Sequence, residues 1–229
     1  MKYIITIITL ISSFSMLSAQ IDCKPYVPTT VGTTWELTNY TDKGKVTGRV
    51  MYELTDKVAN GNDITFSITT TTYDKKDEAI FSSSFDAKCS DGQFSFDMAF
   101  MMDGSMMQAY QSMDVSVDAS DFEIPSMDAA AGTTLADGTL NVGIAGPIAI
   151  NMTVFVTDRK VEKKESISTP AGTYPCLVFT QNVSTKMIVN INSASKEWYA
   201  EGIGLVRSES YNQKGKLLGY SELTKLNIK

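Results

Sequence analysis

Hydrophobic and polar residues alternate along most of the chain. In residues 34–41, Trp35, Leu37 and Asn39 fall on one face, and threonine and glutamate residues fall on the other. A period of two with β-branched and aromatic residues is typical of half-buried strands. Short turns between consecutive strands favour an antiparallel meander. The same alternation predicts further strands over residues 49–58, 63–73, 79–89, 93–100, 113–125, 151–157, 169–191, 197–211 and 217–226.

The middle of the chain departs from this pattern. Residues 101–113 are rich in methionine and poor in β-branched residues. Met106, Tyr110 and Met113 are spaced by four and three residues, which places them on one face of a helix. The sequence therefore predicts a short Met-rich helix between two groups of strands.

Two turns near opposite ends of the chain share one motif. The stretches YTDKGKVTG, from Tyr40, and YNQKGKLLG, from Tyr211, repeat Tyr, Lys, Gly, Lys and Gly in the same register. A phosphate-binding loop would need a helix after the glycine turn, whereas strand patterns flank both stretches. We predict two hairpin tips, in which Asp42 or Asn212 bonds the backbone and the following glycine takes a positive φ.

Two further stretches shape the expected meander. The Asp-Gly pair at 137–138 predicts a tight hairpin turn, because this dipeptide favours two-residue connections between strands. The charged run over residues 158–165 resembles an exposed edge strand, since charged side chains discourage pairing with other chains.

The first residues have the order of a secretory signal peptide. Lys2 is followed by an apolar run and by small residues that end at Ala19. The apolar run is too short to span a membrane, and Cys23 lies too far beyond Ala19 for a lipoprotein signal. We predict that residues 1–20 are removed on export to the periplasm or the extracellular space. Residues 21–229 are then expected to form a single β domain.

The composition excludes several classes of chemistry. The chain contains no histidine, which removes Ser-His-Asp and Cys-His catalysis and nearly all catalytic zinc sites. The net charge is −6 and no basic block is present, so nucleic acid is not an expected partner. No second apolar run reaches spanning length, so we expect no transmembrane segment. We predict that the protein is not an enzyme and holds no metal or cofactor.

Four carboxylates follow the Met-rich segment. They lie mostly opposite Val115 and Val117, as the solvated face of a strand and its loop would. A glycosidase-like pair would need a fixed separation in space, which sequence spacing does not give. We interpret this group as an exposed strand face: Asp114, Asp118, Asp121 and Glu123.

The three cysteines differ in their surroundings. Cys176 lies in the apolar stretch YPCLVF and is expected to be a buried thiol. Cys23 and Cys89 lie beside turn-forming residues, and two cysteines of an exported chain can pair. We predict a disulfide between Cys23 and Cys89.

The methionines allow three interpretations. Methionine fills core or groove surfaces, and it also forms adaptable apolar surfaces for varied ligands. Thioethers also bind Cu(I), but copper carriers usually add His or Cys in tight repeats, which this chain lacks. The candidate ligand-binding residues, for a lipid or another apolar ligand, are Met101, Met102, Met106, Tyr110 and Met113.

Four stretches of the sequence resemble one family. They are TPAGTYPCLVF (169–179), KEWYAEGIGLVRSESYNQKGKLLGYSELTKL (196–226), the opening DCKPYVPTTVGTTWELTNYTDKGKVTG and the central KCSDGQFSFDMAFMMDGSMMQAYQSMDVSV. Together they resemble the exported DUF3108-like proteins of Bacteroidetes, also called the TapB family. The resemblance covers nearly the whole mature chain and is most specific in its last third. It implies a cell-envelope protein with a mainly antiparallel sheet, and it carries no established activity.

These observations lead to one expected architecture and two functional hypotheses. We expect a curved, mainly β meander that forms a half-barrel around the Met-rich helix, by analogy with LolA-like lipoprotein carriers. The first hypothesis is a non-enzymatic envelope protein that binds an apolar ligand or a partner segment on the curved sheet. The alternative is a structural or interaction module without a small-molecule site. An open apolar concavity would favour the first, and a filled core would favour the second; the sequence does not identify an envelope partner.

Overall fold

The computed structural model describes residues 23–98, 107–108, 113–146, 149–187 and 189–229. Within them the named elements are all strands. They are β1 (Thr34–Thr41), β2 (Val46–Asn60), β3 (Asp63–Asp74), β4 (Ala79–Ser90), β5 (Gln93–Asp97), β6 (Asp114–Ala119), β7 (Asp121–Ile124), β8 (Gly138–Ala145), β9 (Ile150–Thr169), β10 (Gly172–Lys186), β11 (Ile191–Ala200), β12 (Gly204–Asn212) and β13 (Leu217–Asn227).

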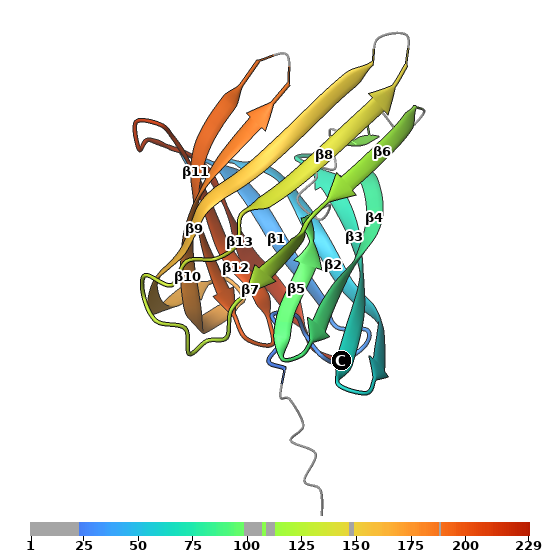
Figure 1. Cartoon of the computed structure of the whole chain (residues 1–229), viewed down its shortest axis with the longest axis vertical. Coiled ribbons are helices and arrows are strands. Elements are labelled where there is room, and N and C mark those ends of the chain that lie inside the picture. Colours follow the sequence, from blue (N-terminus) through green and yellow to red (C-terminus); the bar gives the residue numbers. More distant parts are fainter. Residues whose placement is uncertain (1–22, 99–106, 109–112, 147–148, 188) are drawn as a thin grey trace, which may run out of the picture.

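These strands form one antiparallel sheet that is nearly closed into a barrel (Figure 1). Neighbouring strands follow the order β6-β8-β9-β10-β11-β12-β13-β1-β2-β3-β4-β5-β7. Most neighbours are also consecutive in the chain, as expected for a meander joined by short turns. The predicted mainly antiparallel, curved β fold is confirmed.

A single residue joins the two edges of the sheet. Only Ser120 separates β6, which pairs with β8, from β7, which pairs with β5. The backbone N–H of Ser120 donates to the Thr139 carbonyl at 2.9 Å, and the Ser120 carbonyl accepts from the Met98 N–H at 3.2 Å. The Ser120 Oγ also accepts from the Thr139 N–H at 2.9 Å. The chain therefore crosses from one edge to the other at Ser120 and closes the barrel at that point.

The two predicted hairpin tips have the expected backbone. Gly44 and Gly215 both have a φ of 74°, in the left-handed region that glycine adopts readily. In the β12–β13 tip, the Asn212 Oδ1 accepts two backbone N–H groups at 2.9 and 3.0 Å. In the β1–β2 tip the corresponding acceptor is Thr41 Oγ1, at 3.3 and 3.2 Å. The assignment of this role to Asp42 was wrong, because Thr41 is the residue that aligns with Asn212.

A third tip, between β3 and β4, has the same geometry. The Asp74 Oδ1 accepts the backbone N–H groups of Lys76 and Glu78 at 2.8 and 3.0 Å. Asp77 has a φ of 71° and stands where the other two tips have glycine. Aspartate tolerates this region better than most residues do. The repeated tip therefore does not depend on the KGK motif.

The predicted hairpin at Asp137–Gly138 is wrong. Gly138 begins β8, and the chain before it runs extended beside β9, where the Leu135 N–H donates to the Arg159 carbonyl at 2.9 Å. Hydrogen bonds to β9 hold the segment before Gly138 in an extended conformation, so no turn forms there. A side chain at position 138 would collide with the Met98 sulfur, so the packing leaves room only for glycine there.

Aromatic side chains from the segment before β1 and from β1, β2 and β11 pack together on one side of the sheet. Trp35 and Tyr52 stack with their ring centroids 5.3 Å apart. Tyr26, from the segment before β1, reaches the same space, where it donates to the Pro125 carbonyl at 2.8 Å and lies edge-on to Tyr199. The side of the sheet that carries Trp35, Tyr52 and Tyr199 is called the core face below.

The predicted Met-rich helix over residues 101–113 lies mostly outside the described residues, since residues 101–106 and 109–112 are not among them. The named elements of the described part are all strands, so this helix has no support. Met98, directly after β5, is buried, and Met107 is also buried. Met113 precedes β6 and is 40% exposed.

A disulfide between Cys23 and Cys89 ties the segment before β1 to the end of β4, with the two Cα atoms 5.9 Å apart. Cys176 is a free, buried thiol. Burial raises the pKa of this thiol to about 12, so it remains protonated and unreactive at neutral pH. The expected signal peptide, residues 1–20, lies outside the described residues and stays a prediction.

Candidate functional site: a polar groove on the outer face of the sheet

A groove of about 1160 Å³ opens beside strands β9 to β12 and the β12–β13 tip. Its walls carry hydroxyl, amide and charged side chains, and it is much larger than the apolar space within the core. The side chains that line it include Thr180, Asn182, Ser184, Ala194, Lys196 and Tyr211, with Asn212 and Gln213 at the tip.

Strand register places most of these groups on the side opposite the core face. Asn182, Ala194 and Tyr211 are direct cross-strand neighbours on β10, β11 and β12. Successive side chains of a strand point to opposite faces, so Gln181 and Ser195 lie on the core face instead. The side that carries Asn182, Ala194 and Tyr211 is called the groove face.

Charged groups of both signs lie in or beside the groove. Lys196 Nζ and Glu162 Oε2 form an ion pair at 2.7 Å. The Tyr211 hydroxyl donates to Glu209, whose other oxygen accepts from Arg207 Nε at 2.8 Å. Burial and the Glu209 carboxylate raise the pKa of Tyr211 to about 12. The phenol therefore stays protonated, and the groove presents both donors and acceptors to a polar ligand.

A bulge in β9 separates the groove from the barrel interior. The β9–β10 register shifts between Thr180 and Asn182, and Asp158 has a φ of 54°. The Asp158 carboxylate accepts from Asn182 Nδ2 at 2.7 Å, next to the groove. The next residue, Arg159, is buried with its guanidinium 3.4 Å from the centroid of the Phe122 ring. Bulges of this kind re-aim side chains, and here Val156 and Arg159, three residues apart, are both buried.

Arg159 is held by backbone carbonyls inside the barrel. Its two terminal nitrogens donate to the Ala136 and Glu123 carbonyls at 2.7 and 2.8 Å. Its Nε is buried and has no hydrogen-bond partner. Burial lowers the pKa of Arg159, although the carboxylates of Glu197 and Glu123 oppose that change. The charged run at 158–165 is therefore not uniformly exposed, as its edge-strand interpretation required.

Glu197 is a second buried charge on the core face. Its carboxylate accepts from Gln181 Nε2 at 3.0 Å and from Ser195 Oγ at 3.5 Å. Burial raises the pKa of Glu197, and the Arg159 charge and the neighbouring hydrogen bonds oppose this rise only in part. Arg159 forms no ion pair with it within 4.0 Å. This cluster is polar but enclosed, so it is better suited to fixing the packing than to receiving a ligand.

One apolar cavity on the core face is small. A cavity of about 50 Å³ lies among Tyr26, Trp35, Tyr52, Phe96 and Tyr199. Pockets for drug-sized ligands are typically about 300–1,000 Å³. The space therefore falls well short of what an acyl chain needs, and the aromatic side chains fill this part of the barrel.

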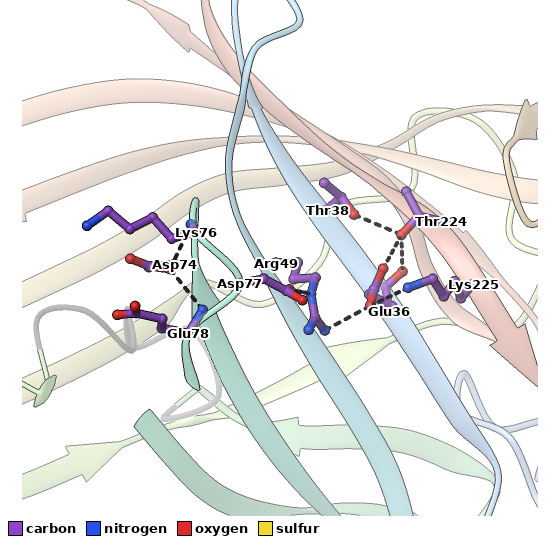
Figure 2. A network of polar contacts seen from close by, with 9 residues as sticks. All are labelled: Glu36, Thr38, Arg49, Asp74, Lys76, Asp77, Glu78, Thr224 and Lys225. Atoms are coloured by element: carbon purple, nitrogen blue, oxygen red, sulfur yellow. Dashed lines mark hydrogen bonds and ion pairs between the residues drawn. The ribbon is translucent and has the colours of Figure 1, made fainter. Parts of the chain in front are cut away.

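Glu36 forms the centre of a polar network across β13, β1 and β2 (Figure 2). Its buried carboxylate accepts from Arg49 at 2.9 Å, from Lys225 at 3.1 Å and from Thr224 at 3.0 Å. Arg49 also binds Asp77 at 2.6 Å, which links the network to the β3–β4 tip. Each oxygen of Glu36 has a donor, so this network reads as a cross-strand clamp and not as a binding site.

The predicted ligand-binding residues are only partly visible. Met101, Met102, Met106 and Tyr110 lie outside the described residues, and Met113 is exposed at the start of β6, away from the groove lining. The four carboxylates of β6 and β7 are exposed: Asp114, Asp118, Asp121 and Glu123. Within the part of the chain that is described, no three Cys, Asp or Glu residues gather as a metal site would require. Nor is any helix there long and apolar enough to cross a membrane.

The groove residues carried no signal in the sequence. Threonine, asparagine and lysine on alternating positions are what any solvated strand face shows. The one local cue is the interruption of alternation after Val156, where Thr157 and Asp158 are followed by the buried Arg159. An interrupted period of two is the mark of a bulge.

The sheet and the groove together define an antiparallel, barrel-like protein with a polar groove on one face. The chain belongs to the DUF3108-like family, whose model matches residues 30–223. No curated protein matches the chain.

Two crystal structures share the fold over 90% of this chain and 100% of their own. One, from Bacteroides fragilis, is described as an exported protein with a YmcC-like fold and is 25% identical, with a TM-score of 0.77. The other, from Parabacteroides distasonis, is described as a lipoprotein and is 22% identical, with a TM-score of 0.80. The second likeness shows the fold alone, because its identity is low.

Proposed function

We propose that this protein is an exported, non-enzymatic binding protein that holds an extended polar segment of an envelope partner in its groove. One observation carries the proposal, namely the contrast between a polar groove of about 1160 Å³ and an apolar space of about 50 Å³. Of the two ligand types first considered, the side chains of the groove favour a partner segment, and the cavity of about 50 Å³ among the aromatic side chains is too small for a lipid. The descriptions of the two related structures as an exported protein and a lipoprotein support the location.

The chemistry of the groove suits a peptide segment. Asn182, Ser184 and Asn192 offer donors and acceptors that can satisfy the backbone groups of an extended chain. Lys160 and the Lys196–Glu162 pair add both charge signs, which gives register and selectivity more than raw affinity.

Site-specific photo-crosslinking in cells that make the protein tests this proposal. A benzophenone amino acid is placed at Asn182 or Gln213 in the groove, and at Asn60, an exposed turn residue at the other end of the sheet, as the matched control. We expect one discrete protein adduct from the groove positions and none from Asn60. Lys196→Glu should reduce the adduct by about fivefold, the equivalent of one lost charge contact.

Two results would overturn it. Equal adducts at Asn182, Gln213 and Asn60 would show that the groove has no preferred partner. A lipid adduct at the groove would favour the apolar-ligand hypothesis instead.

A structural module without a small-molecule site is the second candidate, and the filled aromatic core favours it. Native mass spectrometry of the protein purified from its producing cells separates the candidates. A bare chain that also gives no groove adduct supports the structural module. A bound small molecule contradicts it.

A further inference from the structure

Five hairpin tips lie at one end of the barrel (Figure 1). Strands β8, β10, β12, β1 and β3 run in the same direction, because one antiparallel strand lies between each of them and the next in the sheet. Their following turns therefore share one end, called the tip end. The disulfide, Tyr26 and the C-terminus lie at the other end.

The β10–β11 tip exposes large apolar side chains. Met187, Val189 and Ile191 are 38%, 67% and 60% exposed. They stand together on one projecting turn, whereas single exposed apolar residues scattered over a surface need no explanation. The β8–β9 tip beside it presents Ala145 and Ala149, and its described residues carry no charge.

The other three tips at this end carry lysine pairs. All six side chains are exposed: Lys43 and Lys45, Lys75 and Lys76, and Lys214 and Lys216.

Four carboxylates also lie on these tips, and that of Asp42 lies 3.9 Å from Lys216 Nζ. Asp77 binds Arg49 at 2.6 Å, and Asp74 accepts backbone N–H groups. Lys186 adds a further positive charge at the base of the apolar tip. With seven lysines against the four carboxylates Asp42, Asp74, Asp77 and Glu78, the described tips carry a net charge of +3 in a chain whose net charge is −6.

The turns at the opposite end differ in charge and in hydrophobicity. The β2–β3, β4–β5 and β11–β12 turns contain Asp63, Asp91 and Glu201, and among their described residues there is no lysine. Among the described residues the turns of the two ends are thus unlike, since those of the tip end carry the lysine pairs and the exposed apolar side chains of the β10–β11 tip. The opposite end also exposes apolar side chains, but these lie outside its turns, on the segments before β1 and after β13 and on β2: Val31, Ile228 and Val58.

We propose that the tip end docks on a membrane surface with anionic headgroups. Met187, Val189 and Ile191 enter the boundary between headgroups and acyl chains, while the lysine pairs contact the anionic phosphates. This pairing of an apolar insertion with basic residues around it is the chemistry that holds peripheral proteins on anionic lipid. A protein partner would offer a complementary face, whereas these apolar residues project from a narrow tip that a lipid surface can surround.

Vesicle flotation of the chain from residue 21 onward tests the proposal. The probes are vesicles of phosphatidylcholine alone and of phosphatidylcholine with phosphatidylglycerol. We expect binding to the anionic vesicles, weakened by added salt because headgroup attraction is screened. The double variant Val189→Asp/Ile191→Asp should bind at least about tenfold more weakly, because the apolar insertion is lost. Lys214→Glu/Lys216→Glu should lower binding by about tenfold without affecting any insertion.

Val58→Asp is the matched control, because Val58 is 56% exposed and lies near the other end of β2. Its binding should equal that of the unchanged chain, and circular dichroism should show that all variants are folded. Equal loss in Val58→Asp and in the tip variant would overturn the proposal. So would absence of binding to anionic vesicles, or capture of the tip end by an envelope protein in the absence of lipid.

Discussion

Two buried glutamates, Glu36 and Glu197, have different partners for their carboxylates. Glu36 on β1 lies against Arg49 and Lys225, so its charge is paired by two cations within 3.1 Å. Glu197 on β11 accepts hydrogen bonds from the neutral side chains of Gln181 and Ser195, and the charge of Arg159 acts on it without a direct ion pair. Burial therefore raises the pKa of Glu197, whereas Glu36 is held by direct ion pairs. The comparison teaches that burial of a carboxylate does not by itself indicate a functional site, because its partners decide what it can do.

The largest effect is expected from removing the main cation beside Glu36. Arg49→Met should lower the free energy of unfolding by about 3 kcal/mol, because it leaves a buried carboxylate short of a partner. Urea denaturation followed by circular dichroism measures this. The control is Arg49→Met combined with Glu36→Gln, which should recover much of the loss. If the single and double variants are equally unstable, the ion pair is not the cause.

Removing the donor of Glu197 should have a smaller effect. Gln181→Leu should lower the free energy of unfolding by about 2 kcal/mol, because a hydrogen bond to a buried, partly charged acceptor is lost. The same denaturation assay applies, with Gln213→Leu on the exposed β12–β13 tip as the matched control. A result near zero would mean that Glu197 does not depend on this neutral donor.

Glu197→Gln should have the opposite sign. The folded protein binds the proton of Glu197 more tightly than the unfolded chain does, so this group stabilises the fold most below the ordinary glutamate pKa. That contribution is lost as pH rises through the raised pKa. The amide avoids this loss, so the variant should be more stable than the unchanged chain by about 1 kcal/mol at neutral pH.

The pH dependence provides the decisive measurement. The stability difference between Glu197→Gln and the unchanged chain should vanish in acid, grow as pH rises and then level off. Glu53→Gln, at an exposed position, controls for the loss of one carboxylate from the chain. A difference that does not change with pH would contradict the burial of a titrating Glu197.

The smallest effect is expected at Lys225. Its side chain is 64% exposed, so water screens its pairing with Glu36. Lys225→Met should change the free energy of unfolding by about 0.5 kcal/mol, as for most exposed ion pairs. A loss of unfolding free energy comparable to that of Arg49→Met would show that Lys225 and Arg49 stabilise the Glu36 carboxylate equally.

Much of the sheet could be predicted from the sequence. Trp35 and Leu37 alternate with Glu36 and Thr38, which predicts the strand, although all four residues are buried. The hairpin tips at Gly44 and Gly215 follow from turn chemistry. The third tip was missed because Asp77 stands where glycine was sought. Gly138 was misread as a turn because its requirement for space beside Met98 depends on a strand far away in sequence.

The candidate site could not be predicted in the same way. The groove lies beside the bulge at Asp158, which shifts the alternation of β9 so that both Val156 and Arg159 are buried. A charged run in the sequence does not reveal which of its members will be buried. The predicted methionine site lies mostly outside the described residues, so that hypothesis stays a prediction.

The pairing of β1 with β13 has a consequence for how the molecule comes to be folded. Thr34 is opposite Asn227, so the first strand, which pairs with β2 on one side, finds its neighbour on the other side only in the last strand. Such long-range pairing is slow to form, since the ends of a long loop must meet first. The centre of the sheet therefore cannot assemble until the whole polypeptide has been made, and a chain cut short before β13 would leave a bare edge beside β1, open to association with other chains.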